Sequence, residues 1–328
     1  MNWYRRSVFG QLILRRLVLG LLTLLLVSIV VFAATQLLPG DAARAILGRS
    51  ATPERLAELR AQLHLDQPMA AQYGTWLMGL LSGDLGVSLV NSHPVAEQVG
   101  PRVANSFMLL LIVGIIGIPP AIVIGILAAV QRGGRADTTI SVIALAIAGA
   151  PEFVIAIGLI VLLSTVVFHW LPPVSMVPPG TSILARPKIL VLPVLTLVIV
   201  CFPYIFRMMR ASMIEVLESD YIEMAKLKGL SVGRLVFVHA LPNAIAPTIQ
   251  VVALTFAYLA GGVVVVEFVF GFPGIGQGLV NAVVSRDIPT IQCIVIILAA
   301  FYIVVNILAD VIATGVTPRL RGRAWQQP

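Results

Sequence analysis

Long stretches of apolar residues dominate the chain, and short segments that carry its charges separate them. Between charged residues, positions 17–40 form an uninterrupted stretch of 24 residues and positions 103–131 a stretch of 29. An α-helix rises about 1.5 Å per residue, so about 20 apolar residues cross the roughly 30 Å hydrocarbon core of a bilayer. The pattern therefore predicts membrane-spanning helices.

Six such stretches predict six transmembrane helices. The third begins at residue 138 and is interrupted only by Glu152, and its proline-rich end indicates a loop, which limits this helix to about 138–168. The last three cover residues 189–206, 235–266 and 288–309. Residues 268–285 are also uncharged, but their glycines and Pro273 favour a loop or a re-entrant segment. The predicted fold class is an all-α polytopic membrane protein.

Composition supports this class and excludes several others. Of the 328 residues, 59% are apolar and only 11% are charged, against about 25% charged in ordinary soluble domains. A cytosolic enzyme, a secreted disulfide scaffold and a disordered regulator are therefore excluded. Cys201 and Cys293 lie in apolar stretches without a CxxC pair, which indicates buried thiols and no metal site.

The basic residues predict the orientation in the membrane. The formal net charge is +7, but the charges follow the edges of the apolar stretches, so we expect a lipid bilayer as surroundings and no nucleic acid. In a six-span arrangement, most of these residues fall on one side: Arg5, Arg6, Arg15, Arg16, Arg132, Arg135, Arg207, Arg210, Arg319, Arg321 and Arg323. By the positive-inside rule that side is the cytoplasm, and it holds both termini.

The predicted spans divide the chain into four parts. Residues 1–40 form the cytoplasmic N-terminus and first helix, and residues 41–102 an extracytoplasmic helical loop. Residues 103–314 form the core with a cytoplasmic loop at 207–246, and residues 315–328 a cytoplasmic tail. Within the outer loop, two groups recur at helical spacing and predict two short amphipathic helices: Leu56, Leu59 and Leu63, then Tyr73, Trp76, Leu77 and Leu80.

The cytoplasmic loop is too long and too polar for a simple turn between two spans. Asp220 and Glu223 have the spacing of a capping box, and Gly229 suits a left-handed helix end, so a short helix is predicted at 221–228. Its apolar face would consist of Tyr221, Met224 and Ala225. A rigid helix joined to two spans is suited to transmitting force into them.

The same loop resembles a known motif. Glu223-Met224-Ala225, Gly229 and Leu241-Pro242 keep the spacing of the EAA loop of ABC-importer permeases, E-A-A-x3-G-x9-I-x-L-P, with departures at Met224 and His239. Further segments over about residues 10–320 resemble the dipeptide/oligopeptide/nickel branch of that family in order and spacing: Leu38-Pro39-Gly40-Asp41, Leu65-Asp66-Gln67-Pro68, Gln72-Tyr73, the run from Gly83 to Ser88, Pro94-Val95, the run from Glu267 to Gly276, and Arg286-Asp287.

This resemblance implies a type I ABC importer permease of six helices in a bacterial inner membrane. The EAA loop would dock into a cytoplasmic ATPase through Asp220, Glu223, Met224, Ala225, Gly229, Leu241 and Pro242. The implied partners are a second permease, expected to be a paralogue, two ATPase subunits and an extracytoplasmic solute-binding protein. The chain contains no Gly-Lys dipeptide and hence no P-loop, so we expect no catalysis and no cofactor on this chain, with ATP and Mg²⁺ used by the ATPases.

Polar residues inside the predicted spans are candidates for a substrate path, because a charge near the bilayer centre is costly. Glu152 follows Pro151 within the third helix and could accept a cationic group; the alternative is a protonated structural carboxyl. Asn105 and Gln250 are weaker candidates that could instead join helices. Glu267, beside a glycine-rich loop, fits either an outer gate or an interfacial anchor.

Three classes of protein compete. An ABC permease explains the cytoplasmic loop, whereas a secondary symporter or channel would show paired intramembrane charges or repeats, and an intramembrane hydrolase would need a nucleophile with a base or a metal pair. For the permease we expect peptides as substrates. Nickel chelates and opine- or glycoside-like solutes share the pattern, although no His and Cys cluster favours a bare metal path.

Overall fold

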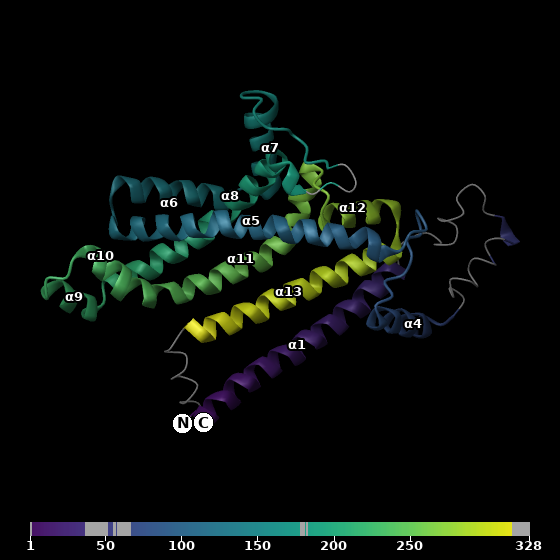
Figure 1. The fold of residues 1–328 in the computed structure, drawn as a ribbon, viewed down its shortest axis with the longest axis horizontal. Helices are drawn as coiled ribbons and strands as arrows, with labels where there is room; N and C mark the ends of the chain where they lie inside the picture. Colours follow the sequence, from purple (N-terminus) through teal and green to yellow (C-terminus); the bar gives the residue numbers. More distant parts are fainter. Residues whose placement is uncertain are drawn as a thin grey trace. The chain divides into compact units, whose positions relative to one another are not determined.

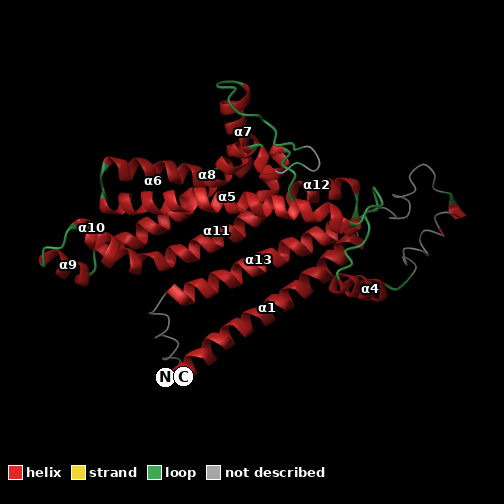
Figure 2. Ribbon diagram, in the orientation of Figure 1, coloured by secondary structure: helices red, strands yellow, loops and turns green. Residues whose placement is uncertain are grey.

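The computed structural model describes residues 2–36, 52–54, 57, 67–177, 181 and 183–316, and its regular elements are helices (Figures 1 and 2). The chain forms two compact units. Unit 1 comprises residues 1–106 and 273–303, and unit 2 comprises residues 107–272 and 304–328. The amphipathic helix predicted from Leu56, Leu59 and Leu63 lies outside the described residues, as do residues 38–41 and the tail from 317.

Unit 1 holds α1 (Asn2–Gln36), α4 (Met69–Ser82), the start of α5 (Val95–Val130), α12 (Ile275–Ser285) and the start of α13 (Ile288–Val316). Helix α4 confirms the second predicted amphipathic helix. Its Tyr73 hydroxyl lies 2.8 Å from Ser28 Oγ of α1, and the rings of Tyr73 and Trp76 pack against Phe32 at 5.5 and 5.7 Å between centroids. Aromatic packing therefore holds α4 along α1.

A buried carboxylate organises the loop that precedes α5. Asp287 accepts hydrogen bonds from Ser88 Oγ at 2.5 Å, from the Leu89 amide at 3.0 Å and from Thr290 Oγ1 at 2.8 Å. Beside it, the apolar core of unit 1 joins α5, α12 and α13 through Val95, Val99, Ile275, Cys293 and Ile294. A charge buried this deeply is tolerated because its oxygen atoms are hydrogen-bonded.

Unit 2 is built around α8 (Pro187–Leu217), which packs against α6 (Arg135–Ala148), α7 (Glu152–Ile160) and α11 (Leu241–Phe270). Phe206 of α8 is fully buried against Ala128 of α5 and Ala144 of α6, two small residues that let three helices approach. At one end, the buried Asp137 pairs with Arg210 through two hydrogen bonds of 2.5 and 2.7 Å. Unit 2 therefore has an apolar interior closed by an ion pair.

The single helix predicted at 138–168 is wrong. Helix α6 ends at Ala148, α7 begins at Glu152, and the pair bends by 106° before a π-helical turn, η2 (Val161–Thr165). Pro151 lacks an amide hydrogen and has extended dihedral angles (φ −61°, ψ 146°), so it cannot continue the ladder of α6. Glu152 consequently occupies the first turn of a new helix.

The end of the fourth predicted span also changes, and residues 268–285 form a bent pair of helices. Helix α8 runs to Leu217, so Arg207 and Arg210 lie within it rather than after it. Residues 268–285, predicted as a loop or a re-entrant segment, contain the end of α11, a short turn and α12, with a bend of 78° between the two helices. A short 3-10 helix, η3 (Ile183–Ala185), precedes α8.

The structure confirms the all-α multi-span class. Among the described residues, 5 helices are long and apolar enough to cross a membrane, or up to 7 if each bent pair is one span. The predicted six spans fall within this range when α6 and α7 together count as one crossing.

Gly125 of α5 should be essential to the packing of unit 2. A Cβ atom there would lie 2.9 Å from Met209 Cβ and 3.0 Å from the Phe206 carbonyl oxygen of α8. We expect Gly125→Ala to destabilise the protein by about 1–3 kcal/mol through overpacking. Gly158→Ala in α7 is the control, because its Cβ would meet nothing within 4 Å. Equal melting temperatures of the two purified variants would contradict this account.

Candidate functional site

The loop that we expect to be cytoplasmic folds into the predicted short helix, α9 (Asp220–Leu227). The capping box expected at Asp220 is wrong, because Asp220 is already helical and Ser219 occupies the cap position. The Ser219 carbonyl oxygen accepts hydrogen bonds from the amides of Ile222 and Glu223 at 3.0 and 3.1 Å, while its hydroxyl donates to Val216 O at 2.5 Å. Asp220 and Glu223 still place negative charge in the first turn, which the helix dipole favours.

The predicted left-handed end of α9 is confirmed at Gly229, whose φ is +78°. The Gly229 amide donates to Lys226 O at 2.9 Å and the Leu230 amide to Ala225 O at 3.4 Å. The chain then passes through α10 (Val232–Arg234) and a π-helix, η4 (Leu235–Ala240), into α11. Glycine suits this reversal because it carries no Cβ that would oppose a positive φ.

Ile222 fixes α9 to the rest of unit 2, and the sequence reasoning missed it. Its side chain is fully buried in a cluster drawn from α5, α8, η4 and α11: Ile126, Ala129, Met209, Met213, Leu235, Val236, Ala240 and Ala244. The available signal was the one β-branched apolar residue of this short helix. Through this cluster, α9 is coupled to both long helices that flank the loop.

Hydrogen bonds add a second attachment on the α11 side. The Tyr221 hydroxyl donates to His239 O at 3.4 Å and accepts from Asn243 Nδ2 at 3.2 Å, and Asn243 Nδ2 also donates to His239 O at 3.0 Å. Leu241 packs against the Ile222 cluster, and Pro242 is exposed at the start of α11. The residues matched to the motif are therefore brought together around α9.

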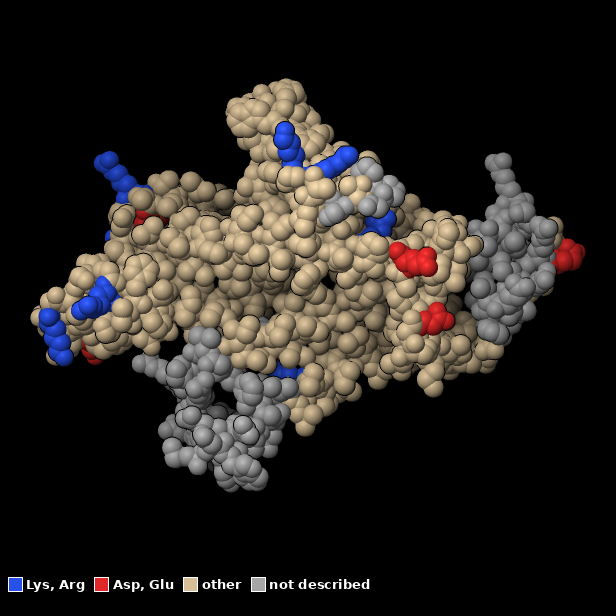
Figure 3. Space-filling view, in the orientation of Figure 1, with Lys and Arg blue, Asp and Glu red and all other residues tan. Residues whose placement is uncertain are grey.

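The loop also presents an apolar surface to the outside of unit 2. We call this the coupling surface, and it consists of the exposed side chains of Tyr221, Met224, Leu227, Val232, Phe237 and Val238. Ala225 does not belong to it, because its side chain packs partly against the Ile222 cluster. Lys and Arg side chains stand at the same end of unit 2 (Figure 3), where Lys226, Lys228 and Arg234 are exposed.

Glu152 lies where α7, α8 and α11 meet. Its Oε1 atom is buried and has no hydrogen-bond partner among the described residues, and it sits 2.7 Å from the position that a Cβ of Gly262 would take. The Tyr258 side chain interacts with its carboxyl group, and Cys201 of α8 lies within electrostatic range. Pro151 is exposed at the cap position of α7 and aims the carboxylate between the helices.

The other candidate path residues lie on α5 and α11. Asn105, in unit 1, donates from Nδ2 to Pro273 O at 2.9 Å and so holds the turn before α12. Gln250 is exposed on α11, 12 residues before Gly262 and so about 18 Å away along the helix. Glu267 is fully buried in the last turn of α11, where its backbone oxygen accepts from the Phe272 amide at 2.8 Å.

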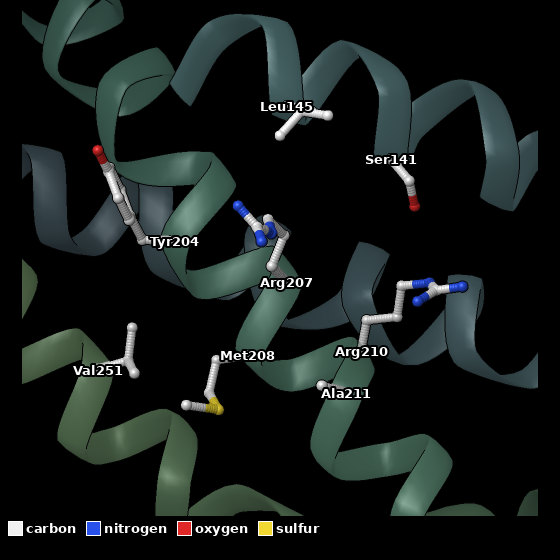
Figure 4. Close-up of a pocket in the computed structure, with 8 residues that line it drawn as sticks. All are labelled: Ser141, Leu145, Tyr204, Arg207, Met208, Arg210, Ala211 and Val251. Carbon is white, nitrogen blue, oxygen red and sulfur yellow. The ribbon is translucent and has the colours of Figure 1, made fainter. Parts of the chain in front are cut away.

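A cavity of about 570 Å³ opens between α6, α8 and α11 (Figure 4). Figure 4 shows side chains from all three helices around it: Ser141, Leu145, Tyr204, Arg207, Met208, Arg210, Ala211 and Val251. Ser141 Oγ is buried and has no hydrogen-bond partner among the described residues. The lining of this open cavity is mainly apolar with a few polar groups.

Comparisons with known proteins place these features in context. Residues 121–322 match the family described as "Binding-protein-dependent transport system inner membrane component", and residues 9–109 match its N-terminal companion family. The chain is 36% identical to the dipeptide transport system permease protein DppB of Escherichia coli K12, with 95% of this chain and 98% of the relative covered. It is 37% identical to a Brucella abortus protein whose name refers to a peptide transport system permease, with 94% and 98% covered.

A solved structure shares the fold. A chain of the MetNI methionine ABC transporter, in inward-facing conformations, matches with a TM-score of 0.52 and 19% identity, covering 68% of this chain and 96% of that chain. At this identity the likeness concerns the fold alone.

Removing the Ile222 side chain should release α9 without disturbing its sequence-encoded helix. We expect Ile222→Ala to lose about 2–5 kcal/mol of packing free energy, because it leaves a cavity in a fully buried cluster. Amide hydrogen exchange over residues 219–230 should then be faster. Met224→Ala is the matched control, since Met224 is exposed on the same helix. Equal protection in both variants would show that the cluster does not hold α9.

Proposed function

Because the chain belongs to the family of binding-protein-dependent transport system inner membrane components, we propose that it is the permease of an ATP-driven importer of di- and oligopeptides. It is a multi-pass inner-membrane protein and a non-catalytic component of its transport system. The observation that carries the proposal is the coupling surface on α9, η4 and their connection, because a cytoplasmic ATPase needs a rigid apolar contact through which to act.

We propose that the coupling surface docks on an ATPase subunit. ATP and Mg²⁺ would be bound by two such subunits, and a second, paralogous permease would enclose the path together with this chain. An extracytoplasmic binding protein would deliver the substrate. The exposed apolar residues Met224 and Leu227 of α9 support the docking role, because a cytoplasmic loop would otherwise expose them to water.

The proposed mechanism follows from the two attachments of α9. A displacement of the docked helix would be passed to α8 and α11 by the Ile222 cluster and by the Tyr221–Asn243–His239 hydrogen bonds. These are contiguous packed contacts, so they can bias the relative positions of two long helices. Transport would then follow the ATPase cycle without chemistry on this chain.

The peptide assignment rests on the relatives whose names refer to peptide or dipeptide transport. Its test is uptake of labelled dialanine by proteoliposomes that contain both permeases, the ATPases and the binding protein. Uptake should require ATP in the ATPase compartment. Uptake driven by an ion gradient alone would support a secondary symporter instead.

A charge on the coupling surface should uncouple the transporter. Leu227 is 77% exposed at the end of α9, and we expect Leu227→Asp to lower both ATPase-subunit binding and dipeptide uptake about tenfold or more, because a carboxylate would be desolvated at the contact. Val90→Asp, at an exposed apolar residue of unit 1, is the control and should leave ATPase-subunit binding unchanged. Normal co-purification of the ATPase with Leu227→Asp would place the docking contact elsewhere.

Cysteine labelling should reveal the orientation proposed from the arginine distribution. In a background without Cys201 and Cys293, a membrane-impermeant thiol reagent applied to intact cells should modify Ala70→Cys in α4. It should spare Gln131→Cys after α5 and Leu227→Cys in α9 until the membrane is permeabilised. Labelling of Leu227→Cys in intact cells would contradict cytoplasmic placement of the coupling surface.

A further inference from the structure

Arg207 brings an uncompensated cation to the cavity of unit 2. It lies 10 residues before the end of α8, and none of the described carboxylates forms an ion pair with it. The neighbouring Arg210, by contrast, is engaged by Asp137. Figure 4 shows the Arg207 guanidinium directed into the space between Tyr204 and Leu145. The Arg207 side chain is exposed at the cavity, so its guanidinium is available to a ligand.

Glu152 provides a carboxyl oxygen that also lacks a hydrogen-bond partner in the described part of the chain. Its Oε1 atom is buried with no hydrogen-bond donor among the described residues, although Tyr258 interacts with the carboxyl group. A buried acceptor without a donor costs about 1–3 kcal/mol, which a bound group could recover. The position therefore suits a ligand that carries several N–H donors.

Two tyrosines connect these charges. Tyr204 lines the cavity that contains Arg207, and its ring centroid lies 6.4 Å from that of Tyr258, the partner of Glu152. Cys201 of α8 lies within electrostatic range of Glu152, and Arg207 follows it by 6 residues, a rise of about 9 Å along the helix axis. An extended di- or tripeptide spans at most about 7–11 Å.

We propose that Glu152 and Arg207 form one binding site that holds the two charged ends of a di- or tripeptide, a refinement that rests on the peptide function proposed above. The ammonium group donates to Glu152 Oε1, and the carboxylate is held by the Arg207 guanidinium, whose planar fork matches two carboxylate oxygens. Between them, Tyr204 and Tyr258 face the peptide group. Met208 and Val251 supply an adaptable apolar wall for varied side chains.

The arrangement favours zwitterions over singly charged solutes. A bound short peptide pairs with both protein charges at once, whereas a ligand with one charged end leaves the opposite protein charge unpaired. The preference for zwitterionic peptides would then come as much from the cost of the unpaired protein charge as from the contacts with the peptide ends.

Uptake of dialanine by the complete transporter in proteoliposomes tests the carboxylate end. We expect Arg207→Gln to lower the uptake rate about tenfold or more, since hydrogen bonds between charged groups are among the strongest. Arg207→Lys keeps the charge but loses the planar guanidinium, so its uptake rate should lie between those of Arg207→Gln and the wild type. Arg186→Gln is the control, because it removes an exposed arginine at the other end of α8, outside the cavity.

Two glycine variants, one of them a control, test the Glu152 end of the site. A Cβ at Gly262 would lie 2.7 Å from Glu152 Oε1, whereas a Cβ at Gly261 would meet nothing within 4 Å. Gly262→Ala should therefore displace the carboxylate and lower dialanine uptake, and Gly261→Ala should behave as wild type.

Peptide binding can also be measured without the binding protein, so that the selectivity of that protein does not contribute. Ala211→Cys, at an exposed residue of the cavity, is alkylated in the purified complex without binding protein. Dialanine should slow this reaction in a saturable manner, and dialanine amide should not. The measurement is repeated in phosphatidylcholine with and without phosphatidylglycerol. Slowing by the anionic lipid alone would mean that Arg207 binds a lipid phosphate, which would overturn the proposal.

The remaining outcomes separate this site from the proposed function. Absence of ATP-dependent dialanine uptake by the wild type would overturn the peptide assignment, and this site with it. Wild-type uptake by Arg207→Gln, or equal protection of Ala211→Cys by dialanine and its amide, would overturn the site and leave the importer function standing.

Discussion

The burial of α8 is the constraint on which unit 2 depends. About 61% of its most apolar window is buried, against at most 33% for each of the other long helices that qualify alone as spans in the described residues. Close approach by α5 and α6 is possible because Gly125, Ala128 and Ala144 are small. Since lipid offers no hydrophobic driving force between helices, such tight van der Waals packing is what holds them together.

The two faces of α8 serve different purposes. Phe206, Met209 and Met213 point into the packed interior and reach the cluster that fixes α9. Tyr204, Arg207 and Ala211, spaced three and four residues apart, line the cavity on another face. A motion received at α9 therefore acts on the same helix that carries the proposed peptide site, and no separate relay element is required between docking and substrate.

Interruptions of the helices determine where Glu152 lies and how the turn before α12 is held. The interruption at residues 149–151 puts Glu152 at the start of α7, where an unbroken helix would have carried it along a different direction. The turn between α11 and α12 is likewise held by Asn105 and Arg102, which donate to the carbonyl oxygens of Pro273 and Gly274. In a membrane, irregular backbone persists where protein groups satisfy it in this way.

Local properties of the sequence determined the membrane class, most of the spans, the short helix at α9 and its exit at Gly229, because apolar length, periodicity and glycine act within a few residues. Tertiary structure alone decided the rest. Arg210 lies within α8 and pairs with Asp137, a residue far away in sequence. The burial of Ile222 and the meeting of Glu152 with Gly262 and Tyr258 depend on helices brought together only by packing. No pattern along one segment encodes such distant contacts.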